Sequence, residues 1–353
     1  MRSIWKQKKG ILVGMVLGII LGIGGFAFIS PPPNSGASGT LTTAGSTTVY
    51  QLSQQWAVYF GVDNPGLSVS PSSGGSGVGQ SLIAQALIDV GATSSFPKEE
   101  FILENPQVEI LPISADALGI IANPAVNGTV LRMDCDMVVA IFQRNVTTWE
   151  EFEETFDVEI QQTGPISVYA RSDASGTTAT FAKWLETAAE NINNNGAEFD
   201  WLLGHEEAIS FPSGIQAVDG NPSVASGVEN DEHAIGYVGL AFLEDFVTVQ
   251  LFNPGNNEWV VPSIDNALKA IPSNLTNPGQ NLMNSELEGA YPIARLLFYM
   301  VNTENLKWYT INYVTWCLIQ GQRYVSEVGY VPIANTAAQY YSLSVIAMLQ
   351  STP

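Results

Sequence analysis

The sequence is poor in basic residues, in histidine and in cysteine. Its 353 residues include 13 Lys and Arg against 34 Asp and Glu, with two His and two Cys, and the formal net charge is −21. Proteins that bind nucleic acid do so through a basic surface, and this chain is strongly acidic, so we predict no nucleic-acid partner. The few His and Cys lack zinc-ligand spacing, which disfavours a structural zinc site, and we predict no metal and no cofactor.

The first 30 residues differ from the rest of the chain. Four of the 13 basic residues and none of the 34 acidic ones lie there, and they precede an uncharged apolar run at 11–29. Such a run is long enough to cross a bilayer, so 1–30 is predicted to be a signal or transmembrane helix, and we favour an uncleaved membrane anchor over a signal peptide. Residues 31–40 are predicted to be a Pro/Gly/Ser linker. The exported remainder has nine basic and 34 acidic residues, a formal −25.

Short apolar runs alternate with amphipathic segments after residue 40, which is typical of an α/β fold. The length of the chain predicts two domains or lobes. The helices are expected around 49–60, 82–87, 181–188 and 309–319, and the strands around 67–70, 88–92, 108–113, 165–171, 234–238, 247–252 and 294–301.

Three predicted helices begin with glycine and hydroxyl residues, at 45–48, 75–79 and 175–178. Helix N-termini carry unpaired N–H groups and the positive end of the helix dipole, so they favour anions, and Ser and Thr hydroxyls add donors. Ordinary N-capping explains any single one of these segments equally well. The third segment also has a charge, since a predicted strand at 168–170 leads into Arg171, whose planar fork suits an oxyanion and which Asp173 could hold in place. A surface pair between Arg171 and Asp173 is the alternative.

Eight segments, in consistent order from 45 to 333, resemble the phosphate-binding proteins of high-affinity phosphate ABC importers. The most specific is Arg171-Ser-Asp173-Ala-Ser175-Gly176-Thr177, which matches an R-x-D-x-S-G-T motif. The others are 45–50, 74–79, 88–92, Ala140-Ile141-Phe142 with Val146 and Trp149, 234–238, 291–293 and 329–332.

The resemblance implies a two-lobed periplasmic-binding-protein fold of type II that closes by a hinge motion. Lobe 1 would hold 41–113 and 241–353, and lobe 2 would hold 114–240. Cys135 and Cys317 would then lie in different lobes and are expected to be unpaired. Asp173 would orient Arg171, which would be the single charge near the anion. The residues expected to surround the anion are Thr47, Thr48, Ser76, Ser94, Arg171, Ser175, Gly176 and Thr177.

The function implied is that of an extracytoplasmic receptor, a monomer and not an enzyme, that captures inorganic phosphate and delivers it to the membrane permease of an ABC importer. Three alternatives stay open: a receptor for another tetrahedral oxyanion such as sulfate, arsenate or molybdate, an exported phosphate-ester hydrolase, and a phosphate sensor or scavenger without transport. His205 and His233 are predicted to be surface residues, which disfavours the hydrolase.

Ser94 departs from the family pattern. The family frequently has an aspartate at this position, and that carboxylate accepts the proton of hydrogen phosphate and repels sulfate. A serine hydroxyl can accept from phosphate and can also donate to sulfate. We therefore expect weaker rejection of sulfate.

Overall fold

The computed structural model describes residues 38–127, 130–188, 199–243 and 246–351. The predicted anchor at 11–29 lies outside these residues, as does most of the predicted linker. Within the described ranges, no helix combines the length and the apolar character needed to span a membrane.

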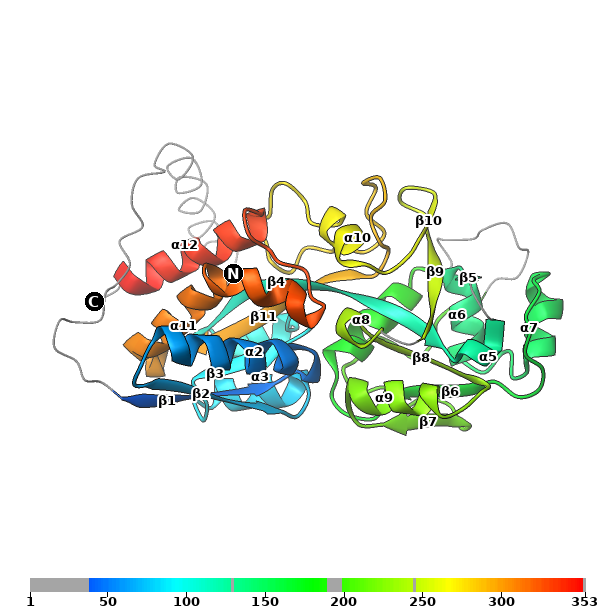
Figure 1. Cartoon of the computed structure of the whole chain (residues 1–353), viewed down its shortest axis with the longest axis horizontal. Coiled ribbons are helices and arrows are strands. Elements are labelled where there is room, and N and C mark those ends of the chain that lie inside the picture. Colours follow the sequence, from blue (N-terminus) through cyan, green and yellow to red (C-terminus); the bar gives the residue numbers. More distant parts are fainter. Residues whose placement is uncertain (1–37, 128–129, 189–198, 244–245, 352–353) are drawn as a thin grey trace. The chain divides into compact units, whose positions relative to one another are not determined.

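Strands and helices alternate along the described chain, as the sequence pattern predicts (Figure 1). The strands are β1 (Gly39–Gly45), β2 (Leu67–Ser73), β3 (Val90–Thr93), β4 (Val108–Ala122), β5 (Leu131–Met133), β6 (Ser167–Arg171), β7 (Ile215–Val218), β8 (Ala234–Gly239), β9 (Val247–Asn253), β10 (Glu258–Val260) and β11 (Ala294–Asn302). The helices are α2 (Thr47–Asp63), α3 (Ser76–Ala84), α4 (Glu99–Glu104), α5 (Pro124–Asn127), α6 (Cys135–Phe142), α7 (Trp149–Phe156), α8 (Gly176–Leu185), α9 (Gly220–Glu229), α10 (Ile264–Lys269), α11 (Trp308–Leu318) and α12 (Ala337–Ser351), with short 3-10 turns η2 (Leu240–Phe242), η3 (Thr303–Asn305) and η4 (Gly321–Val328).

The sheet runs in the order β2-β1-β3-β11-β4-β8-β6-β7. Its two ends are parallel: β1 pairs with β2 and β3, and β6 pairs with β7 and β8. We call the group around β1, β2, β3 and β11 lobe 1, and the group around β6, β7 and β8 lobe 2. The 15-residue strand β4 joins them, since it pairs antiparallel with β11 through its first part and with β8 through its last part (Figure 1). The fold is the two-lobed α/β fold that the resemblance implies.

The structure also shows a connection that the predicted lobe limits do not describe. Strand β9 follows residue 241, yet it pairs with β5, with β10 and with the end of β4. The limits at 113/114 and 240/241 stay a prediction.

The predicted apolar face of the first helix packs into the core. Val49, Leu52, Trp56 and Phe60 of α2 are fully buried, and the Trp56 indole donates to the Gly321 carbonyl at 2.8 Å. Strand β4 is buried along nearly its whole length, as expected for a central strand covered on both faces.

The two cysteines are buried and free, so the expectation of unpaired thiols is confirmed.

Candidate functional site

The three glycine-rich and hydroxyl-rich segments do begin helices. Ser46 caps α2, its hydroxyl accepting from the Val49 N–H, and Ser175 caps α8, its hydroxyl accepting from the N–H groups of Thr177 and Thr178 at 3.1 and 3.2 Å. Gly75 precedes α3 without a side-chain cap. Ser46 and Ser175 therefore act as ordinary N-caps. The capping oxygens accept N–H groups, which leaves each hydroxyl hydrogen available for another acceptor.

Glycine is required where these segments approach one another. Gly45 has φ +137°, and a Cβ there would lie 2.1 Å from the Ala92 carbonyl oxygen. A Cβ on Gly176 would lie 2.7 Å from the hydroxyl oxygens of both Ser76 and Ser94. The start of α8 in lobe 2 therefore packs directly on two hydroxyls of lobe 1, and no larger residue fits without a shift of the lobes.

The structure brings together the eight residues predicted to surround an anion, and we call this cluster the interlobe site. Thr48 Oγ1 lies 3.1 Å from Thr177 Oγ1, and Ser76 Oγ lies 3.2 Å from Ser94 Oγ. All four of these side chains are buried. Its members from lobe 1 follow β1 and β3 or begin α2 and α3, and its members from lobe 2 end β6 or begin α8: Thr47, Thr48, Ser76, Ser94, Arg171, Ser175, Gly176 and Thr177.

Arg171 is held from three directions. Its guanidinium donates to both carboxylate oxygens of Asp173, to the Asn221 side-chain oxygen at 3.3 Å and to Thr47 Oγ1 at 3.1 Å. The predicted contact between Arg171 and Asp173 is therefore present. Burial alone would raise the pKa of Asp173, but the hydrogen bonds and charge of Arg171 outweigh it and lower that pKa. Asp173 stays an anion at neutral pH and fixes a buried guanidinium that faces both lobes.

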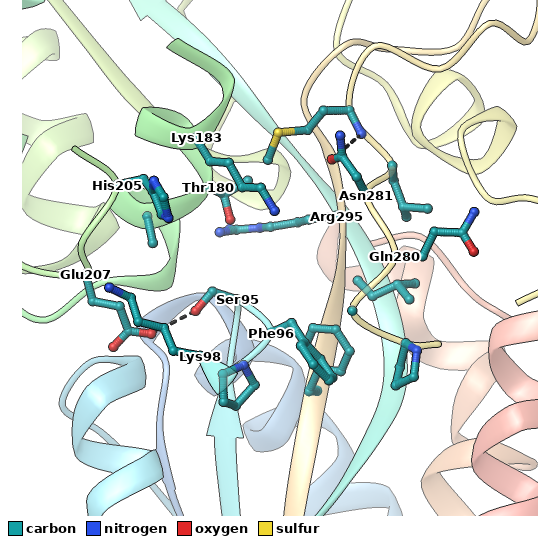
Figure 2. Close-up of a pocket in the computed structure, with 18 of the residues that line it drawn as sticks. Ser95, Phe96, Lys98, Thr180, Lys183, His205, Glu207, Gln280, Asn281 and Arg295 are labelled. Atoms are coloured by element: carbon teal, nitrogen blue, oxygen red, sulfur yellow. Dashed lines mark hydrogen bonds between the residues drawn. The ribbon is translucent and has the colours of Figure 1, made fainter. Parts of the chain in front are cut away.

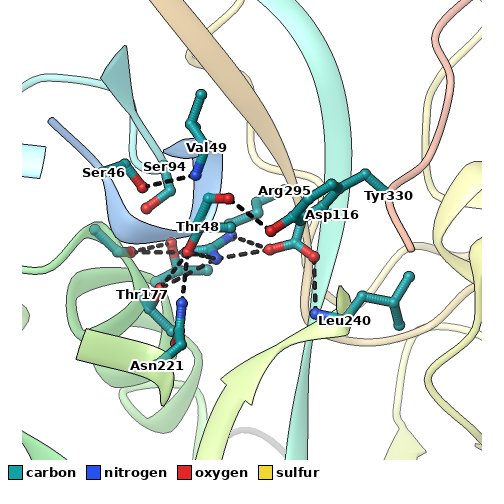
Figure 3. A network of polar contacts seen from close by, with 12 residues as sticks. Ser46, Thr48, Val49, Ser94, Asp116, Thr177, Asn221, Leu240, Arg295 and Tyr330 are labelled. Atoms are coloured by element: carbon teal, nitrogen blue, oxygen red, sulfur yellow. Dashed lines mark hydrogen bonds and ion pairs between the residues drawn. The ribbon is translucent and has the colours of Figure 1, made fainter. Parts of the chain in front are cut away.

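A second arginine lies in the same cluster, so the expectation that Arg171 is the single nearby charge is wrong (Figure 3). Arg295 on β11 stands opposite Asp116 on β4 in the antiparallel register and donates to one Asp116 oxygen at 2.7 and 3.1 Å. It also reaches Thr177 Oγ1 at 3.1 Å, Thr48 Oγ1 at 3.4 Å and the Gly176 carbonyl at 3.1 Å. Burial lowers the pKa of Arg295, and Asp116 opposes that shift.

Sequence reasoning also missed Asn221 and Tyr237. The Asn221 amide donates to Thr48 Oγ1 at 2.9 Å and accepts from Arg171, so one side chain ties both groups together. The Tyr237 hydroxyl accepts the Arg171 N–H and lies 2.7 Å from Thr178 Oγ1, and burial raises the pKa of Tyr237 to about 12. The scarcity of cations was a usable signal for Arg295, because Arg295 is one of only nine basic residues in 31–353 and stands in an apolar strand. Asn221 has no comparable signal.

The network fixes the direction in which the Thr48 and Thr177 hydroxyls donate. Thr48 Oγ1 receives N–H groups from Asn221 and Arg295, and Thr177 Oγ1 receives one from Arg295. A hydroxyl whose lone pairs are occupied by N–H donors turns its hydrogen toward an acceptor. Thr48 therefore donates to Thr177 Oγ1, 3.1 Å away, and the Thr177 hydrogen is left for a ligand. This hydroxyl donor, the Arg171 guanidinium and two helix N-termini converge on one buried place, which is an arrangement suited to an oxyanion.

The carboxylates near the site already have partners. Asp173 accepts from Arg171 and from the Gly220 N–H at 3.2 Å. Asp116 accepts from Arg295 and from the Leu240 N–H at 3.0 Å. Ser94, at the position where the family often has an aspartate, contacts the Ser76 hydroxyl with its own hydroxyl and with its N–H. Among the described contacts of the site, neither carboxylate is left over to accept a proton from a ligand.

Comparisons with known proteins agree with this architecture. The chain is 26% identical to the phosphate-binding protein PstS of Methanocaldococcus jannaschii, over 92% of this chain and 93% of that one. It is also 26% identical to PstS of Haemophilus influenzae, over 83% of this chain and 89% of that one. These relatives confirm the resemblance inferred from the motifs.

Solved structures show the same fold. A putative phosphate ABC transporter substrate-binding protein with bound phosphate, from Clostridium perfringens, matches with a TM-score of 0.63 at 19% identity, over 83% of this chain and 99% of that chain. A high-affinity periplasmic phosphate-binding protein bound with phosphate matches with a TM-score of 0.66 at 16% identity, over 87% of this chain and 93% of that chain. The family model described as PBP superfamily domain matches residues 30–318, and the chain belongs to that superfamily.

Proposed function

We propose that the chain is an extracytoplasmic receptor that holds one inorganic phosphate in the interlobe site. The observation that carries the proposal is the position of Arg171, which ends β6 in lobe 2, is fixed by Asp173 and donates to Thr47 in lobe 1. A buried anion is costly unless each oxygen receives hydrogen bonds. Hydroxyls, N–H groups and one guanidinium from both lobes meet that requirement, and the named function of the relatives supports phosphate as the anion.

Closure of the two lobes would couple phosphate capture to phosphate delivery. Because the ligand groups come from both lobes, an anion would favour the closed arrangement over an open one. The closed receptor, a monomer, would deliver phosphate to the membrane permease of an ABC importer, and the predicted helix at 11–29 would keep it at the membrane. The Clostridium perfringens neighbour is described as a transporter substrate-binding protein, which supports the role in transport. The binding function of the relatives supports a receptor over an enzyme.

A broader oxyanion receptor is a second candidate, and the donor-rich character of the site favours it. Ser94 replaces the carboxylate that would read the proton of hydrogen phosphate, and both Asp116 and Asp173 are engaged by arginines. A site made of donors suits fully ionised sulfate nearly as well as hydrogen phosphate. We therefore expect selectivity for phosphate to be modest.

Titration calorimetry of the full chain with phosphate and with sulfate, at pH 8 and at pH 5, tests both candidates. One-to-one phosphate binding that is tight and exceeds sulfate binding supports the phosphate receptor. Comparable affinities for the two anions support the broader receptor. Binding of neither anion contradicts both.

A further inference from the structure

A pocket lies beside the interlobe site and has a different character. Its volume is about 610 Å³, and its walls come from lobe 1, from lobe 2 and from the loop at 278–283. We call it the side pocket. Figure 2 shows Lys183, Thr180 and Arg295 along one side of this space, with Ser95 and Phe96 along the other. Volumes of roughly 300–1,000 Å³ are usual for sites that take small organic ligands.

Basic residues are concentrated in the side pocket. The exported part of the chain has nine Lys and Arg residues, and three of them, Lys98, Lys183 and Arg295, line this one pocket. His205, one of only two histidines, lines it as well. Glu206 and Glu207 line the pocket too, so its lysines and arginine exceed its carboxylates by one. In a chain whose residues 31–353 carry a formal −25, this local excess of positive charge favours an anionic occupant.

The charges around the pocket are not equally available. Lys98 pairs with Glu206, Arg295 pairs with Asp116, and the His205 ring lies 2.8 Å from a Glu186 oxygen.

Glu207 also faces the pocket, and one of its oxygens accepts from Ser95 at 2.7 Å and from Gln80 at 2.8 Å. Lys183 alone among these cations has no hydrogen bond or ion pair with any residue that the structure describes. It is therefore the cation free to meet a ligand.

The pocket also has an apolar part. Phe96 and Phe298 lie edge to face there, with ring centroids 5.6 Å apart, and Leu282 and Met283 belong to the same wall. An inorganic anion alone would leave this surface without a contact. A ligand with an apolar body and one anionic group would use both parts of the pocket.

We propose that the side pocket binds a small organic anion, with its charged group at Lys183 and its apolar body against Phe96. The side pocket is separate from the interlobe site, although the two share Arg295, whose guanidinium donates to Thr48 and Thr177 on one side and lines the pocket on the other. The inference does not depend on phosphate being the ligand of the interlobe site. Because both lobes line the pocket, an occupant would also favour the closed arrangement.

The test uses the full chain in saturating phosphate, so that the interlobe site is filled, and titrates it with 3-phenylpropanoate by calorimetry. Propanoate, which has the charge without the ring, and 3-phenylpropan-1-ol, which has the ring without the charge, are titrated in parallel. We expect one-to-one binding of 3-phenylpropanoate, at least about tenfold tighter than either fragment.

Two variants separate this pocket from a non-specific surface effect. Lys183→Met removes the charge and keeps the stem of the side chain, and it should weaken 3-phenylpropanoate by about tenfold or more while phosphate binding persists. Phe96→Ala should weaken the same probe through the lost ring contact. The matched control is Lys269→Met, an exposed lysine at the end of α10 outside the pocket, which should bind like the wild type.

Absence of 3-phenylpropanoate binding overturns the inference, and so does equal binding by wild type and Lys183→Met. Equal affinity for the charged probe and the alcohol would also contradict it, since the pocket would then be merely apolar. The outcomes are distinguishable from those of the proposed function. A chain that binds 3-phenylpropanoate and no phosphate would refute the phosphate receptor and leave the side pocket standing, and the reverse result would do the opposite.

Discussion

Replacement of Arg171 by alanine tests the chemistry of the interlobe site most severely. Arg171 makes four hydrogen bonds to protein groups, two of them to Asp173, so a guanidinium with five N–H groups keeps one free for a ligand. Alanine removes the charged donor and also leaves the Asp173 carboxylate unpaired beside the anion. The site would change from one that attracts an anion to one that repels it.

Removal of one member of a buried, hydrogen-bonded charge pair typically weakens binding by roughly 2–5 kcal/mol, which is about 30-fold to several thousandfold in Kd. Because the loss includes both the donor and the uncompensated Asp173, we expect at least about a hundredfold weaker phosphate binding. Arg171→Lys keeps the charge but cannot hold Asp173, Asn221 and Thr47 together, so its affinity should fall between those of the wild type and the alanine variant.

Titration calorimetry with phosphate measures the effect, and circular dichroism with a urea unfolding curve checks that each variant is folded. The matched control is Arg132→Ala, which removes an exposed arginine whose partner is Gln250 in the paired strand β9. Arg132→Ala should bind phosphate like the wild type. A folded Arg171→Ala protein with wild-type affinity would refute the role assigned to Arg171.

Three further predictions concern neighbouring groups. Arg295→Gln should lower the free energy of unfolding by about 3–5 kcal/mol, because it leaves the buried Asp116 charge without its partner. In urea unfolding, the double variant that also carries Asp116→Asn should recover much of that loss. Equal stability of the wild type and Arg295→Gln would contradict this prediction. Ser94→Asp should raise the ratio of phosphate to sulfate affinity in calorimetric titrations at pH 8, because sulfate has no proton to share with a carboxylate. An unchanged ratio would mean that residue 94 does not contact the bound anion. Burial raises the pKa of the Glu207 carboxyl, so the native state binds the carboxyl proton more tightly than the unfolded chain does. The free energy of unfolding should therefore fall as the pH rises from the unfolded pKa through the raised native one. Glu207→Gln should flatten this part of the pH profile of the urea midpoint, and identical profiles for the variant and the wild type would contradict the assignment.

The local parts of the site could be predicted from the sequence because their signals are local. A glycine followed by hydroxyl residues and an apolar periodicity predicts a helix start, and α2, α3 and α8 do begin at such segments. The pair formed by Arg171 and Asp173 is two residues apart and could be expected from the motif alone. These features depend on backbone geometry and capping, which act over a few residues.

The parts that could not be predicted depend on pairing between distant strands. Asp116 and Arg295 meet only because β4 and β11 run antiparallel in one register, and that register is set by the tertiary fold. Asn221 enters the site from the start of α9 without any motif around it. The pairing of β9 with β5 likewise has no local signal, and the strand predicted at 108–113 extends to Ala122 in the structure because both lobes cover it.

A crystal structure of the full chain grown with phosphate tests the central claim most directly. The account predicts one phosphate between the lobes, with an oxygen within hydrogen-bonding distance of the Arg171 guanidinium and others facing the Thr177 hydroxyl and the N-terminus of α8. Phosphate bound elsewhere, with Arg171 still held by Asp173 and out of its reach, would contradict the account.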